Sequence, residues 1–227
     1  MAEVLQRRVL AWDGPTRLFK WSLVLAVVDG WASNRFGASS PAWHIWNGYA
    51  ALTLIVFRLL WGFVGGSTAR FASFVAGPRR VLDYLRRSRA YLGHNPLGGW
   101  MVLELLAVVA AQCLTGLYSA DEDRLIIAGP LARTVAAATV DFAARWHHRI
   151  FAGIEALVAL HVLANLYFAF LRREPLISAM IAGRKPAACY ADMPAARPGQ
   201  WTTAALCLVA AAAFVVGGVL AAGARAL

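Results

Sequence analysis

The chain has 227 residues, of which 60% are hydrophobic and 15% are charged. Soluble domains carry about a quarter charged residues, so this composition excludes an ordinary soluble protein and indicates an integral membrane protein. The formal net charge of +10 does not indicate nucleic-acid binding, because the arginines cluster between apolar runs instead of forming one basic face.

Five apolar segments are long enough to cross a hydrocarbon core of about 30 Å, which requires about 20 helical residues. Before the first segment, Asp13 can cap a helix and Pro15 suits its first turn. That segment has no convincing cleavage site and is expected to be a retained anchor. The pattern therefore predicts an all-α integral membrane fold. The predicted spans are 16–33, 43–64, 99–118, 146–171 and 202–222.

The fifth segment differs from the others because it is rich in Ala and Gly and has neither charge nor histidine. Such a composition suits close packing against a neighbouring helix or a partner subunit, so an oligomer or subunit contact is one expectation. A plain membrane anchor is the alternative.

Basic residues concentrate before the first span and in the connections from the second span to the third and from the fourth to the fifth. The alternate connections have little excess positive charge. The positive-inside rule then puts the N-terminus in the cytoplasm and the C-terminus in the periplasm. The basic residues concerned are Arg7, Arg8, Arg17, Arg70, Arg79, Arg80, Arg86, Arg87, Arg89, Arg172, Arg173, Arg184, Lys185 and Arg197.

Several aromatic residues lie near the predicted helix ends. His94 precedes the third span, where Asn95 and Pro96 indicate a turn and a helix start, and we expect a structural role for it. Tryptophans near span ends are typical of an aromatic belt at the membrane surface. The six tryptophans assigned to this belt are Trp12, Trp21, Trp43, Trp46, Trp100 and Trp146.

Four histidines lie at or inside the predicted helices, where an ionisable group is costly and is a functional candidate. His44 and the adjacent His147 and His148 lie at the outer ends of the second and fourth spans. His161 is about 20 Å deeper than His148 at 1.5 Å per residue, in the same cytoplasmic half as Lys20. The residues thus form two candidate pairs, although helix–helix hydrogen bonding is the structural alternative for any single histidine.

Paired nitrogen ligands across a helical bundle suggest haem bound on both axial faces. Zinc requires three or four converging ligands, and no such cluster is visible in the sequence. A proton relay favours membrane carboxylates, but Asp29, Glu104 and Glu155 are scattered. Gly48, one turn after His44, suits a flat macrocycle, although glycine is common in membrane helices.

The choice between the two adjacent histidines depends on helix rotation. Thirteen positions rotate a helix by about 220°, so His148 and His161 face different neighbours, as two separate haems would require. His147 would instead share a face with His161. We therefore prefer His148 as the ligand, with His147 as an interfacial group.

Several motifs in order give the chain a family resemblance over about residues 10–185. They are WDGPTRLFKWSLV, HIWNGYAALTLIVFRLLWGFVGG, RFASFVAGPRRVLDYL, LGHNPLGGWMVL, LTGLYSADED, HHRIFAGIEALVALHVLANLYF and RREPLISAMIAGRK. The chain resembles the bacterial cytochrome b561 family, which includes the b-type cytochrome subunit of nickel–iron hydrogenases. The resemblance implies four helices that hold two b haems, with His44, His148 and His161 at family ligand positions.

The chain departs from the family pattern at Lys20, where a histidine usually precedes the tryptophan. Three alternatives are open. Lys20 ligates the inner haem iron opposite His161 as a neutral amine, or it extends to the cytoplasmic surface and leaves His161 as the sole ligand. In the third alternative the inner haem is absent and Lys20 is structural.

Two arginines are candidates for contact with haem propionates. Arg58 lies inside the second span and Arg17 lies one turn before Lys20, and a propionate would supply the carboxylate that each guanidinium needs. Contact with lipid headgroups is the alternative for both. For His94, contact with a propionate or a quinone is the alternative to a structural role.

The resemblance implies a bacterial inner-membrane diheme cytochrome that carries electrons between a periplasmic partner and quinone. The partner would be a c-type cytochrome or a redox enzyme subunit, and direct oxidation of a small species such as superoxide is a variant. The expected organisation is a four-helix cytochrome domain at 10–185, a cytoplasmic linker at 186–200 and a fifth transmembrane helix at 201–227. The alternatives are a non-redox helical membrane subunit and a cytochrome with one haem.

Overall fold

The computed structural model of the chain describes residues 8–36, 41–87, 90–121, 127–187, 190 and 195–223. The predictions for Arg7 and Arg89, and for parts of the 186–200 linker, fall outside the described residues.

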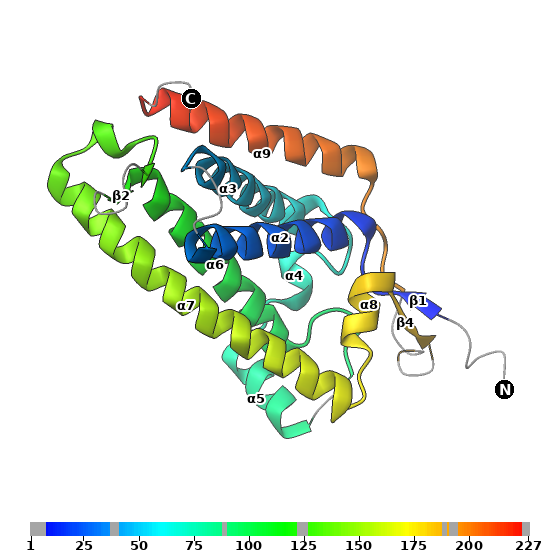
Figure 1. The fold of residues 1–227 in the computed structure, drawn as a ribbon. Helices are drawn as coiled ribbons and strands as arrows, with labels where there is room; N and C mark the ends of the chain where they lie inside the picture. The colour runs from blue at the N-terminus through cyan, green and yellow to red at the C-terminus, as the bar shows by residue number, and fades with distance from the viewer. Residues whose placement is uncertain are drawn as a thin grey trace. The chain divides into compact units, whose positions relative to one another are not determined.

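The described residues form eight α-helices and two small antiparallel strand pairs, which confirms the all-α prediction (Figure 1). Strand β1 (Arg8–Leu10) pairs with β4 (Arg184–Pro186), and β2 (Ala120–Asp121) pairs with β3 (Ile127–Ala128). A short 3-10 turn, Ala132–Thr134, precedes α7. The helices are α2 (Gly14–Phe36), α3 (Pro41–Val64), α4 (Phe71–Phe74), α5 (Pro78–Arg87), α6 (Pro96–Tyr118), α7 (Ala137–Phe170), α8 (Leu176–Ala182) and α9 (Trp201–Ala221).

Four of the described helices, α3, α6, α7 and α9, are long and apolar enough to cross a membrane. The first predicted span is also helical, because α2 covers 23 residues. However, α2 includes Arg17, Lys20 and Asp29 and does not reach the same apolar character. Its helical structure is confirmed, whereas its passage through the membrane remains a prediction.

Two predicted helix starts are confirmed by hydrogen bonds from backbone amides to capping side chains. The Thr16 amide donates to Asp13 Oδ1 at 2.9 Å, and the Gly98 amide donates to Asn95 Oδ1 at 2.7 Å. In contrast, α7 begins at Ala137, well before the predicted start at residue 146. The predicted start was placed where the apolar run begins. A helix can extend beyond the apolar run into polar sequence outside the membrane.

The chain forms two compact units. Unit 1 contains Met1–Lys20, Leu59–Glu104 and Val158–Cys207, and unit 2 contains Trp21–Arg58, Leu105–Leu157 and Leu208–Leu227. Each unit therefore draws its residues from distant parts of the sequence. The predicted division of the chain at 186–200 remains a prediction.

In unit 1, the β1–β4 pair and α8 lie beside a small buried core (Figure 1). Trp12 belongs to this core, so its assignment to the membrane-surface belt was wrong. His94 packs against the rings of Trp12 and Phe74, with centroid distances of 4.5 and 4.7 Å, which agrees with the expected structural role. The amphipathic indole ring serves here as core packing because the chain before α2 folds back on β4.

The described end of the predicted linker is hydrogen-bonded within unit 1. The Arg197 amide donates to Ser67 Oγ at 2.9 Å, and the Gly199 amide donates to Asp13 Oδ2 at 3.1 Å. The buried Asp13 side chain therefore binds both the start of α2 and the segment that precedes α9.

Candidate functional site

Unit 2 brings together two histidines from α3 and α7. The rings of His44 and His147 lie 6.3 Å apart between centroids, at an interplanar angle of 81°. Both side chains are half-buried. Two imidazoles from different helices therefore lie close together, as one of the two candidate pairs requires.

His44 has a hydrogen-bonding partner at Nδ1. Ser33 Oγ lies 3.0 Å from the Gly30 carbonyl and 3.2 Å from His44 Nδ1. Ser33 can donate its one proton to Gly30 and accept the Nδ1 proton of His44. The lone pair is then on Nε2, which is the arrangement of a histidine prepared to bind a metal.

His147 is held in the same tautomer by α6. His147 Nδ1 donates to the Gln112 carbonyl at 3.0 Å, and Thr115 Oγ1 lies 3.3 Å away, with its proton directed to the Ala111 carbonyl at 2.8 Å. The Gln112 amide nitrogen lies 3.1 Å from His147 Nε2, so it donates to the lone pair there. Among the described atoms, the buried Gln112 Oε1 has no hydrogen-bond partner. The amide thus occupies the position from which an iron would bind.

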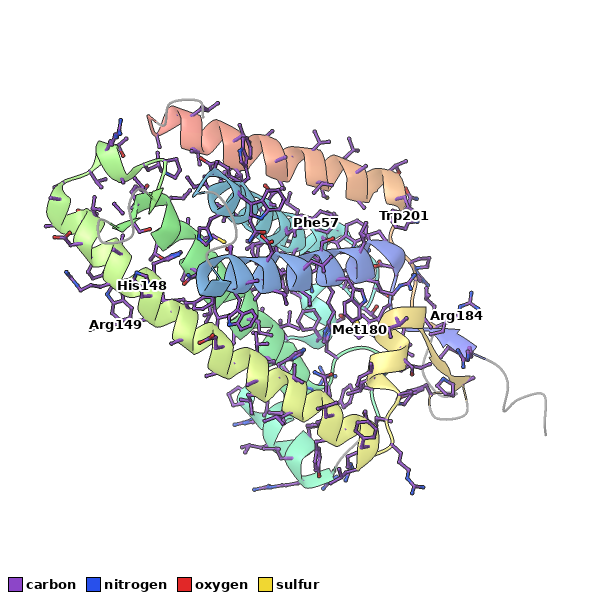
Figure 2. The ribbon with its side chains drawn as sticks, viewed as in Figure 1. Phe57, His148, Arg149, Met180, Arg184 and Trp201 are labelled. Atoms are coloured by element: carbon purple, nitrogen blue, oxygen red, sulfur yellow. The ribbon has the colours of Figure 1, made fainter. Side chains whose placement is uncertain are left out.

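His148, the ligand preferred from the sequence, has a different environment. Its side chain is exposed beside Arg149 on α7, and its ring centroid is 6.3 Å from that of His147 (Figure 2). The structure therefore brings His147, not His148, against His44. The sequence argument compared only the directions in which His148 and His161 point around the helix axis. It could not include which face of α7 contacts α3, because that depends on the tertiary structure. The role of His148 remains a prediction, and this geometry favours His147.

Gly116 provides the space into which the His147 ring packs. A Cβ built at Gly116 would lie 2.9 Å from His147 Cε1 and 3.3 Å from Nδ1. Because the ring is fixed by its bonds to α6, we expect Gly116→Ala to destabilise the protein by about 1–2 kcal/mol. The measurement is the midpoint of thermal unfolding in detergent. Gly217→Ala is the control, because a Cβ there meets nothing within 4 Å. Equal midpoints for the two variants would contradict the packing argument.

Gly48, one turn after His44, leaves room beside the helix backbone. A Cβ built there would meet nothing within 4 Å. Two imidazoles from facing helices are a donor set that suits a haem iron, provided that the Gln112 amide leaves His147 Nε2. The ligand types in unit 2 therefore fit the group that the sequence predicts.

The second candidate pair lies in unit 1. Lys20 on α2 is half-buried and within electrostatic range of His161 on α7. Asn165 Nδ2 is 3.1 Å from His161 Nε2 and 2.7 Å from the His161 carbonyl, so this amide donates to the ring. His161 Nε2 is therefore also an acceptor, and Lys20 and His161 belong to the same compact unit.

The two candidate propionate ligands have different surroundings. Arg17 Nη1 donates to the Ile181 carbonyl at 2.5 Å, and its buried Nε has no hydrogen-bond partner among the described residues. Arg17 belongs to unit 1, as Lys20 and His161 do. Arg58 belongs to unit 2, and its side chain is 2% exposed. A side chain so deeply buried does not contact lipid headgroups.

Two of the three membrane carboxylates have structural partners in unit 2. Asp29 accepts a hydrogen bond from the Trp43 indole at 3.0 Å, and Glu155 accepts one from the Trp31 indole at 3.1 Å. In the part of the chain that the structure describes, no group of three or more His, Cys, Asp or Glu side chains could hold a metal ion. These carboxylates therefore connect helices.

Four polar residues that contact the histidines were not predicted. They lie in otherwise apolar helices, and the cost of a polar side chain in the membrane would have identified them as candidates. They are Ser33, Gln112, Thr115 and Asn165.

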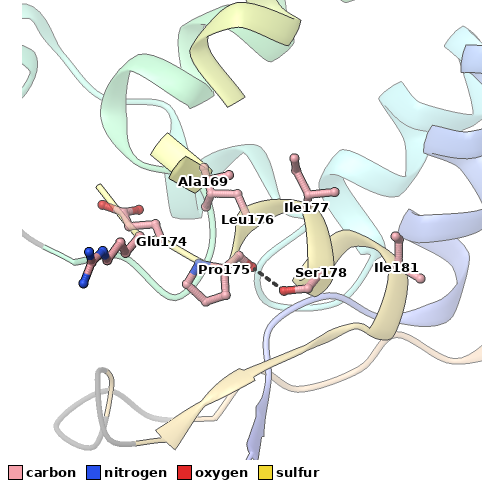
Figure 3. Close-up of a pocket in the computed structure, with 8 residues that line it drawn as sticks. Ala169, Glu174, Pro175, Leu176, Ile177, Ser178 and Ile181 are labelled. Carbon is pink, nitrogen blue, oxygen red and sulfur yellow. Dashed lines mark hydrogen bonds between the residues drawn. The ribbon is translucent and has the colours of Figure 1, made fainter. Parts of the chain in front are cut away.

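A cavity of about 430 Å³ lies where α7 ends and α8 begins, within unit 1 (Figure 3). Its wall is mainly aliphatic, with Arg173, Glu174 and Ser178 as polar groups, and Ser178 Oγ donates to the Pro175 carbonyl at 3.4 Å. The wall includes Ile181, whose carbonyl binds Arg17. The cavity is therefore linked to the turn of α2 that precedes Lys20.

The fold and the histidine pair define a helical membrane protein suited to bind haem. The chain belongs to the prokaryotic cytochrome b561 family, whose model matches residues 11–183. Members are b-type cytochromes that transfer electrons in membranes. No curated protein and no solved structure shows a significant match to the chain.

Proposed function

We propose that the protein is a diheme b-type cytochrome that carries electrons between a periplasmic redox protein and the quinone pool. The observation that carries the proposal is the division of the nitrogen ligands into two pairs, each inside one compact unit. His44 and His147 belong to unit 2, and Lys20 and His161 belong to unit 1. A cytochrome with one haem is the alternative, and a non-redox subunit is not supported by the family.

In unit 2, His44 and a histidine of α7 would hold the outer haem. Contact with His44 supports His147, and His148 is the ligand expected from the sequence. Bound haem would supply reversible one-electron transfer at iron. Nδ1 protons bound to Ser33 and to the Gln112 carbonyl would leave the lone pairs of both rings on Nε2. The Gln112 amide would have to turn away from His147 Nε2 for the ligand to bind iron.

In unit 1, Lys20 and His161 would hold the inner haem. An amine binds iron only when neutral, and burial and metal binding both favour loss of its proton. Arg17, whose buried Nε has no hydrogen-bond partner among the described residues, is proposed to bind a propionate of this haem, and the buried Arg58 of unit 2 is a separate candidate for a propionate. A His161-only site and the absence of an inner haem are the alternatives to this ligation.

The charge distribution supports a cytoplasmic N-terminus and a periplasmic C-terminus in the bacterial inner membrane. The surface of α9 exposes apolar side chains such as Leu206 and Phe214, which supports contact with lipid or with a partner subunit. We place the periplasmic partner, a c-type cytochrome or redox enzyme subunit, next to the outer haem.

We propose that the quinone ring enters the cavity between α7 and α8. Quinol oxidation releases two electrons and two protons. The electrons would pass to the haems one at a time, and Glu174 can accept one proton while the other passes to the surrounding water. The aliphatic wall suits the quinone tail, and the Arg17–Ile181 bond links the cavity to the Lys20 segment.

A purified sample tests this function by haem reduction with a short-chain quinol. We expect Ser178→Phe, which fills the cavity, to slow reduction about tenfold, since overfilling a site typically costs 1–3 kcal/mol. Ala182→Phe on α8 is the control, because Ala182 is exposed and does not line the cavity. Dithionite should reduce all samples fully. Unchanged quinol reduction in Ser178→Phe would exclude this cavity, and a sample without haem would exclude the cytochrome function.

A further inference from the structure

Helix α5 separates its apolar and basic residues onto two faces. At about 100° per residue, Val81, Leu82, Tyr84 and Leu85 lie on one face and the arginines on the other. Arg80 and Arg87 flank the apolar face on the side of Tyr84, and Arg79 and Arg86 flank it on the opposite side. Four arginines and one aspartate within ten residues make the helix strongly basic.

The two ends of the apolar face have different surroundings. Tyr84 is 7% exposed and accepts a hydrogen bond from Asn95 Nδ2 at 2.9 Å, so one edge of α5 is attached to unit 1. Leu82 and Leu85 are 52% and 61% exposed. Exposed leucines flanked on both sides by arginines are typical of a helix that lies in a membrane surface.

The position of α5 in the chain agrees with this location. It follows α3 and the short helix α4 and precedes α6, and both α3 and α6 are able to span a membrane. Since α5 belongs to the connection between these two helices, it is expected near the surface that α3 leaves and α6 enters. The exposed leucines would then enter the acyl region, while the arginines reach the headgroup layer.

A cavity of about 300 Å³ opens beside α5 on the Tyr84 side. It is lined by Arg80, Asp83, Tyr84, Arg87 and Tyr91. Arg80 and Arg87 supply two guanidinium groups against one carboxylate, a surplus that suits a phosphate. Asn95 is the donor in its bond to Tyr84, so the Tyr84 hydroxyl still has its own proton to donate. Burial, together with the nearby Glu174 carboxylate, raises the pKa of that hydroxyl and keeps it protonated.

We propose that this cavity binds the phosphodiester headgroup of an anionic phospholipid while Leu82 and Leu85 anchor α5 in the acyl layer. The two arginines attract the phosphate, and Tyr84 donates a hydrogen bond to it. A zwitterionic lipid would bring a cationic choline close to the same guanidinium groups, so it should bind less well. This site is distinct from the proposed haem and quinone sites and does not depend on either.

Native mass spectrometry of the detergent-purified full chain, mixed with phosphatidylglycerol or phosphatidylcholine, tests the proposal. We expect retention of phosphatidylglycerol in preference to phosphatidylcholine. An arginine near an anionic surface contributes about fivefold in affinity, so Arg80→Gln with Arg87→Gln should lower retention roughly 25-fold. The matched control, Arg79→Gln with Arg86→Gln, removes the same charge from the same helix outside the cavity and should lose much less.

Several results would overturn the proposal. Equal loss in the two double variants would mean diffuse attraction of lipid to a basic helix without a headgroup site. Equal retention of both lipids by the parent protein would remove the anionic preference. Displacement of phosphatidylglycerol by excess inorganic phosphate, with no effect of Leu82→Ser and Leu85→Ser, would indicate a site for free phosphate. Circular dichroism and gel filtration establish that each variant is folded.

Discussion

Lys20→Leu is expected to lose the inner haem and to lower the haem content from about two per chain to about one. Leucine keeps an apolar side chain at this position but has no atom that can bind iron, so the loss would identify the amine as the cause. The half-buried Lys20 lies within electrostatic range of His161 in the same compact unit. Lys20→His should keep both haems, because it restores the residue that the family pattern usually has at this position.

Low-temperature electron paramagnetic resonance, with haem quantified per chain, separates the alternatives. If Lys20 is a ligand, the parent protein gives one signal unlike bis-histidine ligation, and Lys20→His converts it to a bis-histidine signal. Two bis-histidine signals that neither substitution alters would contradict Lys20 ligation and require another inner ligand. One haem per chain in the parent would mean that the lysine marks a site without haem.

His147→Ala is expected to remove the outer haem, whereas His148→Ala is expected to leave it in place. The adjacent histidines form a matched pair, because they share a helix and differ in the face that they occupy. His147 contacts His44 and is oriented by Gln112, while His148 is exposed. His44→Ala should resemble His147→Ala, since each removes one of the two axial ligands. The measurement is haem per chain together with the absorption spectrum of the reduced protein.

The reverse result would restore the ligand that helix rotation predicted. Loss of haem in His148→Ala with retention in His147→Ala would mean that α7 turns about its axis when haem binds. The Gly116 contact and the Gln112 bonds to His147 would then belong only to the protein without haem.

The helices could be predicted from the sequence because apolar runs and caps are local properties. The starts of α2 and α6 follow from Asp13 and Asn95, whose side chains are three residues from the amides that they bind. The early start of α7 was not predictable from hydropathy, because Asp141 and Arg145 end the membrane run without ending the helix. Trp12 looked like a surface aromatic because its burial depends on α8 and residue 196, which are distant in sequence.

The candidate site was predicted in its residue types but not in its contacts. Intramembrane His44, His161 and Lys20 are visible as costly polar groups. The choice between His147 and His148 depends on which face of α7 meets α3, and this is a tertiary property. The proton positions also depend on Ser33, a partner from another helix.

The two bonds of Asp13 can form only at different times during synthesis of the protein. Its Oδ1 atom can cap α2 as soon as Thr16 has been made, whereas its Oδ2 atom binds the Gly199 amide, 186 residues later in the chain. The ribosome therefore supplies the second partner only shortly before α9 is made. Until then, water or the insertion machinery must solvate this carboxylate oxygen, and the final closure of unit 1 is a late step of biogenesis.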